Sequence, residues 1–243
     1  MMKYIYNIDN LKNHNENTVF EEKIGKKAQN LLELAANGFN VPHFSVITNR
    51  YFKEIILKEI EMYNQEAGNN DEIKDWDAVF SGNTERKIEN IIRIIKNHKI
   101  REEFEKEIEN VLNEESYYAV RSSSIEEDSS NFSFAGQFET YLYIKKENIM
   151  EKVKEVWISS FSSHVMKYRK EGKINNEINV PAVIIQEMVN SEKAGVGFSV
   201  NPVNGNYDEI VISGTYGLGT SIVDGDENGD LFIYNKKTKE IKK

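Results

Sequence analysis

The chain has 243 residues, no cysteine, and 40 acidic against 31 basic side chains, which gives a net charge of −9. This length allows one large domain or two lobes with a buried core. The acidic balance argues against general nucleic-acid binding, and the lack of cysteine excludes disulfides and thiolate metal sites. No apolar run approaches the roughly 18 residues of a membrane span, and the N-terminus lacks a signal-peptide pattern. We therefore expect a cytoplasmic protein with no membrane partner.

The first elements of the chain include a helix whose beginning carries a lysine. Residues 4–8 alternate as in a short strand, and the apolar residues of 28–35 show helical spacing, with Gly38 placed to end the helix. Lys27 then lies at the first helical turn, where unpaired backbone N–H groups and the helix dipole favour an anion. A lone lysine at such a place is more often simply solvated, and the residues alone leave both interpretations open.

The next part of the chain is predicted to be scaffold. We expect a strand over 44–48, a helix over 51–65, a polar and turn-rich connection over 67–82, a helix with Thr84 as its N-cap, and an amphipathic helix over 104–112. The dense charges between the apolar stripes are typical of solvated helix faces.

The run from Tyr117 to Tyr143 contains the residues best suited to chemistry. Two β-prone segments, 117–120 and 138–144, flank a polar loop that is too long for a tight hairpin. Loops of this length inside compact domains are usually functional or disordered. The loop is therefore the first place to look for a site.

Within this run, an arginine and a group of small residues are placed to bind an anion. Arg121 lies where the first strand ends, and its guanidinium suits phosphate or carboxylate. Ser133, Ala135 and Gly136 would let backbone N–H groups approach an anion closely. The alternative is a solvated loop in which the arginine forms a surface ion pair with the carboxylates of 126–128.

The second half of the chain predicts one long helix and then several strands. The helix covers 149–168, and a buried strand over 182–185 follows it. Further strands are expected over 194–200, 209–214 and 231–234. The glycines of 214–219 lack the spacing of a dinucleotide-binding fingerprint and no helix pattern follows them, so we exclude that fold.

Several separated blocks of this sequence together resemble the N-terminal ATP-grasp domain of the phosphoenolpyruvate-utilising dikinases. That group comprises phosphoenolpyruvate synthase, pyruvate, phosphate dikinase and the rifampin phosphotransferases. The blocks are, in chain order, residues 24–31, 119–123, 133–137, 157–169, 194–199 and 214–225. Three departures are Lys26, where the family has a second glycine, His43 with Phe44 after the proline, where it usually has Pro-Gly-Phe, and Thr220, where it has a glutamate.

The resemblance implies an α/β (α+β) fold of the ATP-grasp type. It implies an N-terminal lobe over residues 1–184, followed by the hinge and the first part of a truncated second lobe over 185–243. Catalytic roles and nucleotide-phosphate contacts fall on Lys27 and Arg121. The remaining nucleotide-binding residues implied by the resemblance are Ser133, Ala135, Gly136 and Thr140 for the phosphates and Gln186, Glu187, Met188 and Val189 for adenine.

The resemblance also implies parts that this sequence does not include. The family's metal-binding glutamate and Gln-x-Arg-Pro motif are not found here, so we expect the metal ligands beyond Lys243 and none within the chain. A phosphohistidine domain would be a partner within a larger protein. We expect this piece alone to bind the nucleotide weakly and to catalyse no turnover.

The activity implied by the resemblance is that of an ATP-dependent phosphotransferase of the pyruvate, water dikinase type, with ATP and Mg²⁺ as cofactors. The β-phosphoryl group of ATP would pass through a histidine on another domain to pyruvate. One alternative is a rifampin phosphotransferase, which shares this domain. Another is a non-catalytic nucleotide-binding module, which the departures at Lys26 and Thr220 suggest.

Overall fold

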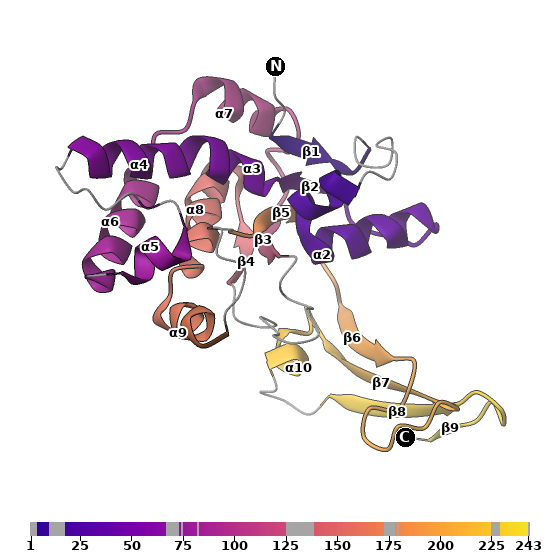
Figure 1. Ribbon diagram of the computed structural model, residues 1–243. Helices are drawn as coiled ribbons and strands as arrows, with labels where there is room; N and C mark the ends of the chain where they lie inside the picture. The colour runs from indigo at the N-terminus through magenta and orange to yellow at the C-terminus, as the bar shows by residue number, and fades with distance from the viewer. Residues whose placement is uncertain are drawn as a thin grey trace. The chain divides into compact units, whose positions relative to one another are not determined.

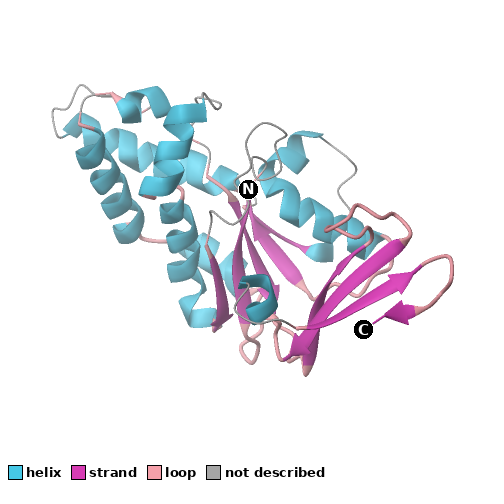
Figure 2. Cartoon of the chain, turned by 90° about the horizontal axis from the view of Figure 1, so that it is seen from below, coloured by secondary structure: helices cyan, strands magenta, loops and turns pink. Residues whose placement is uncertain are grey.

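The protein is described from a computed structural model, which defines residues 4–9, 18–66, 73, 75–81, 83–124, 139–172, 178, 180–224 and 229–242. It combines helices with antiparallel sheets, an α+β arrangement (Figure 2). The chain divides into two compact units, Met1–Met188 and Val189–Lys243. The identification of such units with the lobes of an ATP-grasp fold stays a prediction.

The first unit is built on a five-stranded antiparallel sheet in the order β1-β2-β5-β3-β4 (Figure 1). Its strands, in that order, are Ile5–Asn7, Phe44–Ile47, Ala182–Glu187, Tyr118–Ser123 and Thr140–Ile144. The run of β-branched residues in β5 predicted a buried strand, and β5 indeed lies at the centre of the sheet with its first five residues buried.

Helices cover both faces of this sheet. Figure 1 shows α2 on one side and α4, α6 and α8 on the other. The helical segments are α2 Thr18–Ala36, α3 Asn49–Tyr51, the π-helical η1 Phe52–Ile56, α4 Leu57–Glu66, α5 Trp76–Phe80, α6 Thr84–Asn97, α7 Glu102–Glu109, the 3₁₀ segment η3 Lys146–Asn148, α8 Ile149–Ser159 and α9 Ser163–Gly172.

Two cores result from this layering. The larger core lies on the side of α8 and contains Trp157, Tyr51 and Val120. The smaller core lies beneath α2 and contains Ala28 and Ile184. Because alternate residues of a strand point to opposite faces, β2 and β5 contribute to both cores.

Three predictions about the helices were wrong. Asn83, and not Thr84, is the N-cap of α6, since its side chain accepts a hydrogen bond from the backbone N–H of Arg86 at 3.1 Å. The connection expected to be polar and rich in turns contains the helix α5, which Asp75 caps by accepting from the N–H of Ala78 at 2.8 Å.

The third error concerns the helix predicted over 149–168, which is two helices. The chain turns over 160–162 between α8 and α9. The hydroxyl of Ser162 then accepts a hydrogen bond from the N–H of Val165 at 3.4 Å, as serine commonly does at a helix start. The apolar spacing continues through this turn, which is why periodicity alone did not detect it.

The second unit is an antiparallel meander of four strands in the order β6-β7-β8-β9. Its elements are β6 Lys193–Phe198, β7 Glu209–Tyr216, α10 Thr220–Asp224, β8 Asp230–Asn235 and β9 Ile241–Lys242. The three predicted strands are confirmed, whereas the absence of a helix after the glycines was wrong, because α10 lies there. Since α10 has five residues and the described strands pair antiparallel, no β-α-β unit is present among the described residues.

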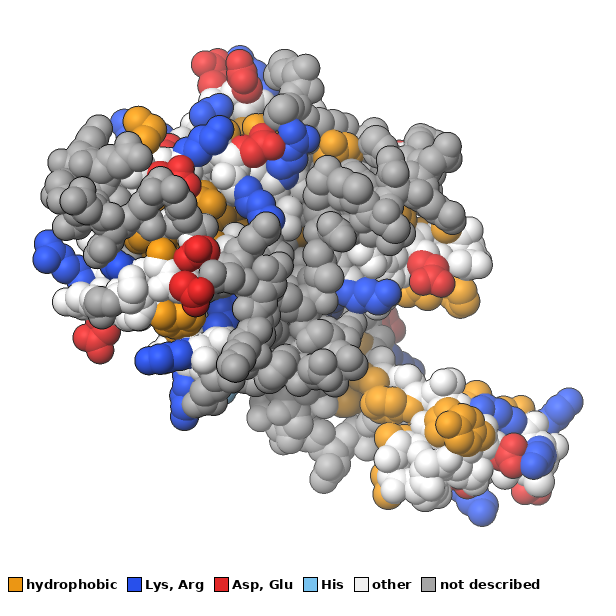
Figure 3. Space-filling view, in the orientation of Figure 1, with side chains coloured by type: hydrophobic (Ala, Val, Ile, Leu, Met, Phe, Trp, Pro, Cys, Tyr) orange, Lys and Arg blue, Asp and Glu red, His pale blue; other side chains and the backbone are white. Residues whose placement is uncertain are grey.

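Apolar side chains lie on both faces of this second sheet. The register places Ile212 opposite Phe232 on one face and Val211 opposite Ile233 on the other. Several of the apolar side chains of the unit are exposed, among them Tyr216 at 80%, and Figure 3 shows hydrophobic atoms grouped on its visible surface. This pattern differs from the apolar and polar alternation of a sheet that has one solvated face.

Candidate functional site

A break in the first helix shapes the region around the predicted lysine. Gly25 interrupts α2 with φ 74° and ψ 166°, a backbone conformation that favours glycine. A Cβ atom at this position would lie 2.1 Å from the backbone oxygen of Ser123, the last residue of β3. The helix therefore starts again after Gly25, directly against the end of the strand that carries Arg121.

Hydrogen bonds join the restarted helix to this strand end. The backbone N–H of Lys26 donates to the carbonyl of Ser124 at 3.2 Å, and the N–H of Ala28 donates to the hydroxyl of Ser123 at 3.1 Å. Two of the N–H groups expected to favour an anion are thus already used within the protein. Attraction of an anion at this helix start must come chiefly from the side chain of Lys27.

The amine of Lys27 lies beside the strand that carries the arginine. Its Nζ is 3.4 Å from the hydroxyl oxygen of Ser122, the residue that follows Arg121. Arg121 in turn donates from Nη1 to the side-chain oxygen of Gln186 on β5, at 3.1 Å. One series of contacts therefore links the start of the helix, the end of β3 and the end of β5.

The strand register shows which face the arginine occupies. Arg121 is paired with Ile184 on β5 and with Thr140 on β4. Residues directly opposite one another in a sheet point to the same side, so these three side chains share a face. Ile184 belongs to the core beneath α2, and Arg121 is therefore on the face that α2 covers.

Thr140, which is predicted to contact a phosphate group, shares this face of the sheet with Arg121. It is exposed and lies at the start of β4, opposite the half-buried Arg121. Ser133, Ala135 and Gly136, predicted to cradle phosphate oxygens, lie outside the described residues.

The residues predicted to hold adenine follow one another along the end of β5, but their surroundings differ. Gln186 is 7% exposed, and its side-chain oxygen accepts from Arg121. Glu187 is half-buried, and its oxygen Oε1 is 3.5 Å from the hydroxyl of Ser116. Val189 is exposed and is the first residue of the second unit.

Backbone groups at this position are partly committed to the first unit. The N–H of Glu187 donates to the carbonyl of His43 at 2.9 Å, and the N–H of Met188 donates to the carbonyl of Tyr117 at 2.8 Å. The sulfur of Met188 also lies 2.9 Å from the N–H of Tyr143. A ligand read by backbone donors in this segment must therefore use N–H groups other than those of Glu187 and Met188.

Three residues of this region, Gly25, Ser122 and Ser123, were not predicted from the sequence as part of the site. Ser123 contacts the helix at Gly25 and at Ala28, and Ser122 contacts the amine of Lys27. The signal was available as three consecutive serines after Arg121 and a glycine two positions before a lysine. Small and hydroxyl-bearing residues in such pairs indicate a close approach of two backbones.

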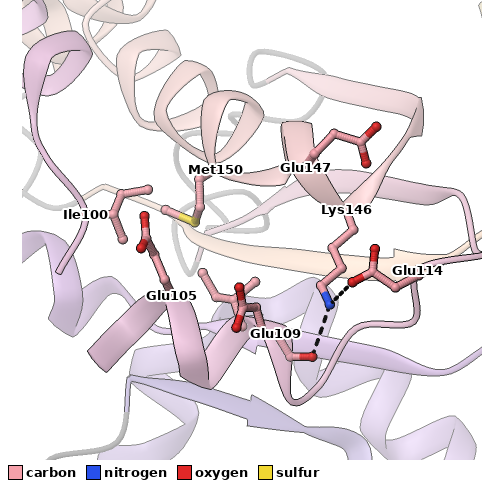
Figure 4. A pocket seen from close by; sticks show the side chains of 8 residues that line it. Ile100, Glu105, Glu109, Glu114, Lys146, Glu147 and Met150 are labelled. Atoms are coloured by element: carbon pink, nitrogen blue, oxygen red, sulfur yellow. Dashed lines mark hydrogen bonds and ion pairs between the residues drawn. The ribbon is translucent and has the colours of Figure 1, made fainter. Parts of the chain in front are cut away.

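A separate pocket of about 470 Å³ in the first unit contains none of the predicted site residues. Figure 4 shows the amine of Lys146 turned towards Glu114, at 2.6 Å from its carboxylate, and towards the backbone of Glu109. The apolar wall of this pocket packs against the larger core and not against the core beneath α2. The eight residues that line it are Ile100, Glu105, Ile108, Glu109, Glu114, Lys146, Glu147 and Met150.

The described part of the chain holds neither a cluster of metal ligands nor a membrane-spanning helix. No three His, Cys, Asp or Glu side chains gather there so that they could hold a metal ion. Of the helices described, none combines the length and apolarity needed to cross a membrane.

Comparison with known proteins gives a match over most of the chain. Residues 21–243 match the family model described as "Pyruvate phosphate dikinase, AMP/ATP-binding domain". An uncharacterized phosphotransferase of Bacillus subtilis, YvkC, is 37% identical over 223 residues, which cover 90% of this chain and 24% of that protein. A probable phosphoenolpyruvate synthase of Methanocaldococcus jannaschii is 35% identical over 248 residues, with 99% and 20% covered.

A shorter match is closer in sequence. The phosphoenolpyruvate synthase of Pyrococcus furiosus is 44% identical over 131 residues, which cover 53% of this chain and 16% of that protein. The chain thus spans 16% to 24% of the length of these three relatives.

Proposed function

This chain belongs to the family of pyruvate phosphate dikinase AMP/ATP-binding domains, and from that premise we propose that it is the ATP-grasp part of a dikinase-type phosphotransferase. ATP is the substrate that it binds. The two relatives named phosphoenolpyruvate synthase support this class of reaction, since they match 99% and 53% of the chain.

The proposed reaction takes place in the full-length protein. The β-phosphoryl group of ATP passes to a histidine on another domain and from there to pyruvate. The γ-phosphoryl group is transferred to water and leaves as phosphate, and AMP is the remaining product. The name of the Bacillus relative specifies no acceptor, so an antibiotic of the rifampin type stands as the second candidate. The exposed Thr220, in place of a carboxylate, favours a third, a nucleotide-binding module without catalysis.

Lys27 and Arg121 carry the chemistry in this proposal. Both are cations, and positive charge fixed beside the transferred phosphoryl group stabilises the negative charge that develops there. The observation that carries the proposal is that the start of α2 packs on the end of β3, where the N–H of Ala28 donates at 3.1 Å to the hydroxyl of Ser123, whose side chain shares the face of Arg121. This contact brings the helix start to the strand end that carries the second cation.

The other site residues complete the proposed nucleotide contacts. Backbone N–H groups at Ser133, Ala135 and Gly136 would approach the phosphate oxygens, and the hydroxyl of Thr140 would add a further contact. Residues 186–189 would hold adenine. Magnesium is proposed as a cofactor of the full-length protein, but the described residues offer no set of ligands for it, and no step here is derived through it.

Titration with ATP tests the proposal on this chain. Lys27→Ala and Arg121→Ala are each expected to lower ATP affinity by about tenfold or more, the size of one interaction with a charged group. Lys58→Ala and Arg86→Ala serve as matched controls, because both side chains are exposed on helices of the same unit. Unchanged affinity in both site variants would overturn the proposal.

Formation of AMP by the full-length protein tests the finer assignment. Arg121→Ala is expected to abolish it, whereas Arg86→Ala should leave it unchanged. A product assay with pyruvate and with a rifamycin as alternative acceptors separates the two candidate reactions. ATP binding without AMP formation in the presence of either acceptor would favour the non-catalytic module.

A further inference from the structure

Two pockets of the first unit share part of their lining and form one groove. The pocket of about 470 Å³ described above shares Ile100 and Met150 with a second pocket of about 440 Å³. The other residues that line the second pocket are Lys96, Glu151, Lys154, Glu155 and Ile158. We propose that the groove they form, the α7–α8 groove, binds a basic amphipathic helix of a partner protein. The inference is independent of the proposed function, because no predicted nucleotide-binding residue lines either pocket.

A row of side chains on α8 forms one side of the α7–α8 groove. Met150, Lys154 and Ile158 are four residues apart, so they lie along one line of the helix. Another face of α8 is buried in the larger core through Val153 and Trp157. Met150 and Ile158 are only half-buried and supply the apolar part of the line. At about 1.5 Å per residue the line is about 12 Å long, which matches about two turns of a helix lying beside it.

Negative charge predominates in the first pocket of the groove. Four carboxylates line it with the single amine of Lys146, and that amine is already 2.6 Å from the carboxylate of Glu114. Glu105 and Glu109 are exposed and lie one turn apart on α7, a spacing at which like charges repel each other. Figure 4 shows Glu105 extending from α7 towards Met150. A cationic group in the groove would therefore meet carboxylates next to apolar surface.

The second pocket is balanced in charge. Two carboxylates and two amines line it, and the amine of Lys154 donates to the backbone carbonyls of Lys96 and His98 at 3.2 and 2.6 Å. The excess of negative charge therefore belongs to the first pocket. A ligand that complements both pockets has apolar side chains along α8 and basic side chains towards Glu105 and Glu109.

The walls of the groove favour a helix as this ligand. None of the residues that line the two pockets, all of them within the described part of the chain, belongs to a strand. The groove therefore offers no strand edge to which an extended peptide could add. Side chains four apart on α8 form a ridge that packs between the ridges of another helix. Apolar residues on one face and lysine or arginine beside them give the incoming helix both kinds of contact.

A titration followed by nuclear magnetic resonance locates the binding site. The probe is a synthetic peptide of leucine and lysine in which leucine forms one face of the helix. The chain carries ¹³C in its methionine methyl groups, and the signals of Met150 and Met62 are identified by their loss in Met150→Leu and Met62→Leu. We expect the peptide to shift the signal of Met150 and not that of Met62, which is exposed on α4. No binding, or binding with the Met150 signal unmoved, would overturn the proposal.

The charge of the α7 wall is tested by the double variant Glu105→Gln, Glu109→Gln. It should bind the peptide about threefold to tenfold more weakly, the effect of two exposed ion pairs, and this difference should shrink as salt is added. Glu85→Gln with Glu89→Gln is the matched control, because both residues are exposed and one turn apart on α6. This control should bind like the wild type. Equal losses in the two double variants would show attraction by net charge alone and would overturn the proposal.

Two further ligands test the requirement for an amphipathic helix. A peptide of the same composition, with its leucines distributed around the helix, keeps the charge without an apolar face, and spermine keeps positive charge without a helix. Both should bind at least tenfold more weakly than the first peptide, and an equal affinity of either would overturn the proposal. A shift of the Met150 signal with chain concentration, in the absence of peptide, would identify a second copy of the chain as the occupant and would also overturn it.

Discussion

The backbone oxygen of Ser123 occupies the space in which a side chain on Gly25 would stand. The distance from that oxygen to a Cβ atom at Gly25 would be 2.1 Å, which no real pair of such atoms tolerates. This contact holds the start of a helix against the end of a strand almost 100 residues later in the chain. It explains why a glycine is needed two positions before Lys27.

Replacement of Gly25 by alanine is expected to destabilise the first unit strongly. The new methyl group would collide with a backbone atom, and the positive φ would add strain, for a total of about 2 kcal/mol or more in the free energy of unfolding. Gly38→Ala is the matched control, because Gly38 ends the same helix at φ 82° with no atom within 4 Å of its Cβ position. Gly38→Ala should lower the free energy of unfolding only by the strain of the left-handed backbone, about 1 kcal/mol.

Urea unfolding of the two variants gives the comparison directly. A larger loss in Gly25→Ala than in Gly38→Ala would confirm that the contact with Ser123 constrains the position. Losses of equal size would show that backbone strain alone accounts for the glycine, and that the helix start is not packed tightly on β3.

The hydroxyl of Ser123 is expected to contribute to stability through the helix start. It accepts the buried N–H of Ala28 at 3.1 Å, and Ser123→Ala would leave this donor without that acceptor. The expected loss is about 1 to 2 kcal/mol in the free energy of unfolding, as for an N-cap or a buried unsatisfied donor. Ser199→Ala, at an exposed serine, is the control, and a Ser123 variant as stable as this control would contradict the assignment.

Much of the scaffold could be predicted from the sequence because its signals are local. The apolar alternation and β-branched runs identified β3, β4 and β5, and the glycine after the first helix was placed correctly. Gly38 has positive φ, and the N–H groups of Gly38 and Phe39 return to the carbonyls of Ala35 and Leu34. Boundaries marked by a single polar side chain, such as Asn83, were less certain because Thr84 offers a similar cap.

The contacts within the candidate site could not be predicted in the same way. The bond between Arg121 and Gln186, which are 65 positions apart in sequence, depends on the register of the two strands that carry them. A shift of one residue would move every side chain of a strand to the other face, and local patterns do not fix that register. The packing of Gly25 on Ser123 likewise needs the tertiary structure.

A hydroxyl at residue 140 is expected to strengthen ATP binding. Thr140 lies opposite Arg121 on the neighbouring strand, and the two side chains point to the same face. Thr140→Val keeps the branched shape and the strand preference but removes the hydroxyl, so ATP affinity should fall about threefold to tenfold, as for one neutral hydrogen bond. Thr140→Ser should retain most of the affinity in the same titration, and equal affinities for all three proteins would exclude a contact by this hydroxyl.

Alkaline pH is expected to destabilise the first unit through Tyr51. This side chain is fully buried, and its hydroxyl is 3.0 Å from Nε2 of His98, whose Nδ1 is 2.9 Å from the carboxylate of Glu59. Burial, as the main cause, raises the pKa of Tyr51 from its ordinary value of 10.0 to about 12. The folded protein therefore keeps this proton at a pH at which the unfolded chain has released it.

The sign of the pH effect follows from this difference in bound protons. Stability from the protonated Tyr51 is fully present below pH 10 and is lost as the pH rises from about 10 to about 12, by about 1 kcal/mol per pH unit. Unfolding by urea at pH 8, 10 and 11 should show a steeper decline for the wild type than for Tyr51→Phe. The slopes with pH, and not the absolute stabilities, are to be compared, because the substitution also removes the hydrogen bond to His98. The other buried tyrosines are present in both proteins and cancel in the difference, so parallel slopes would mean that Tyr51 ionises equally in the folded and unfolded chains.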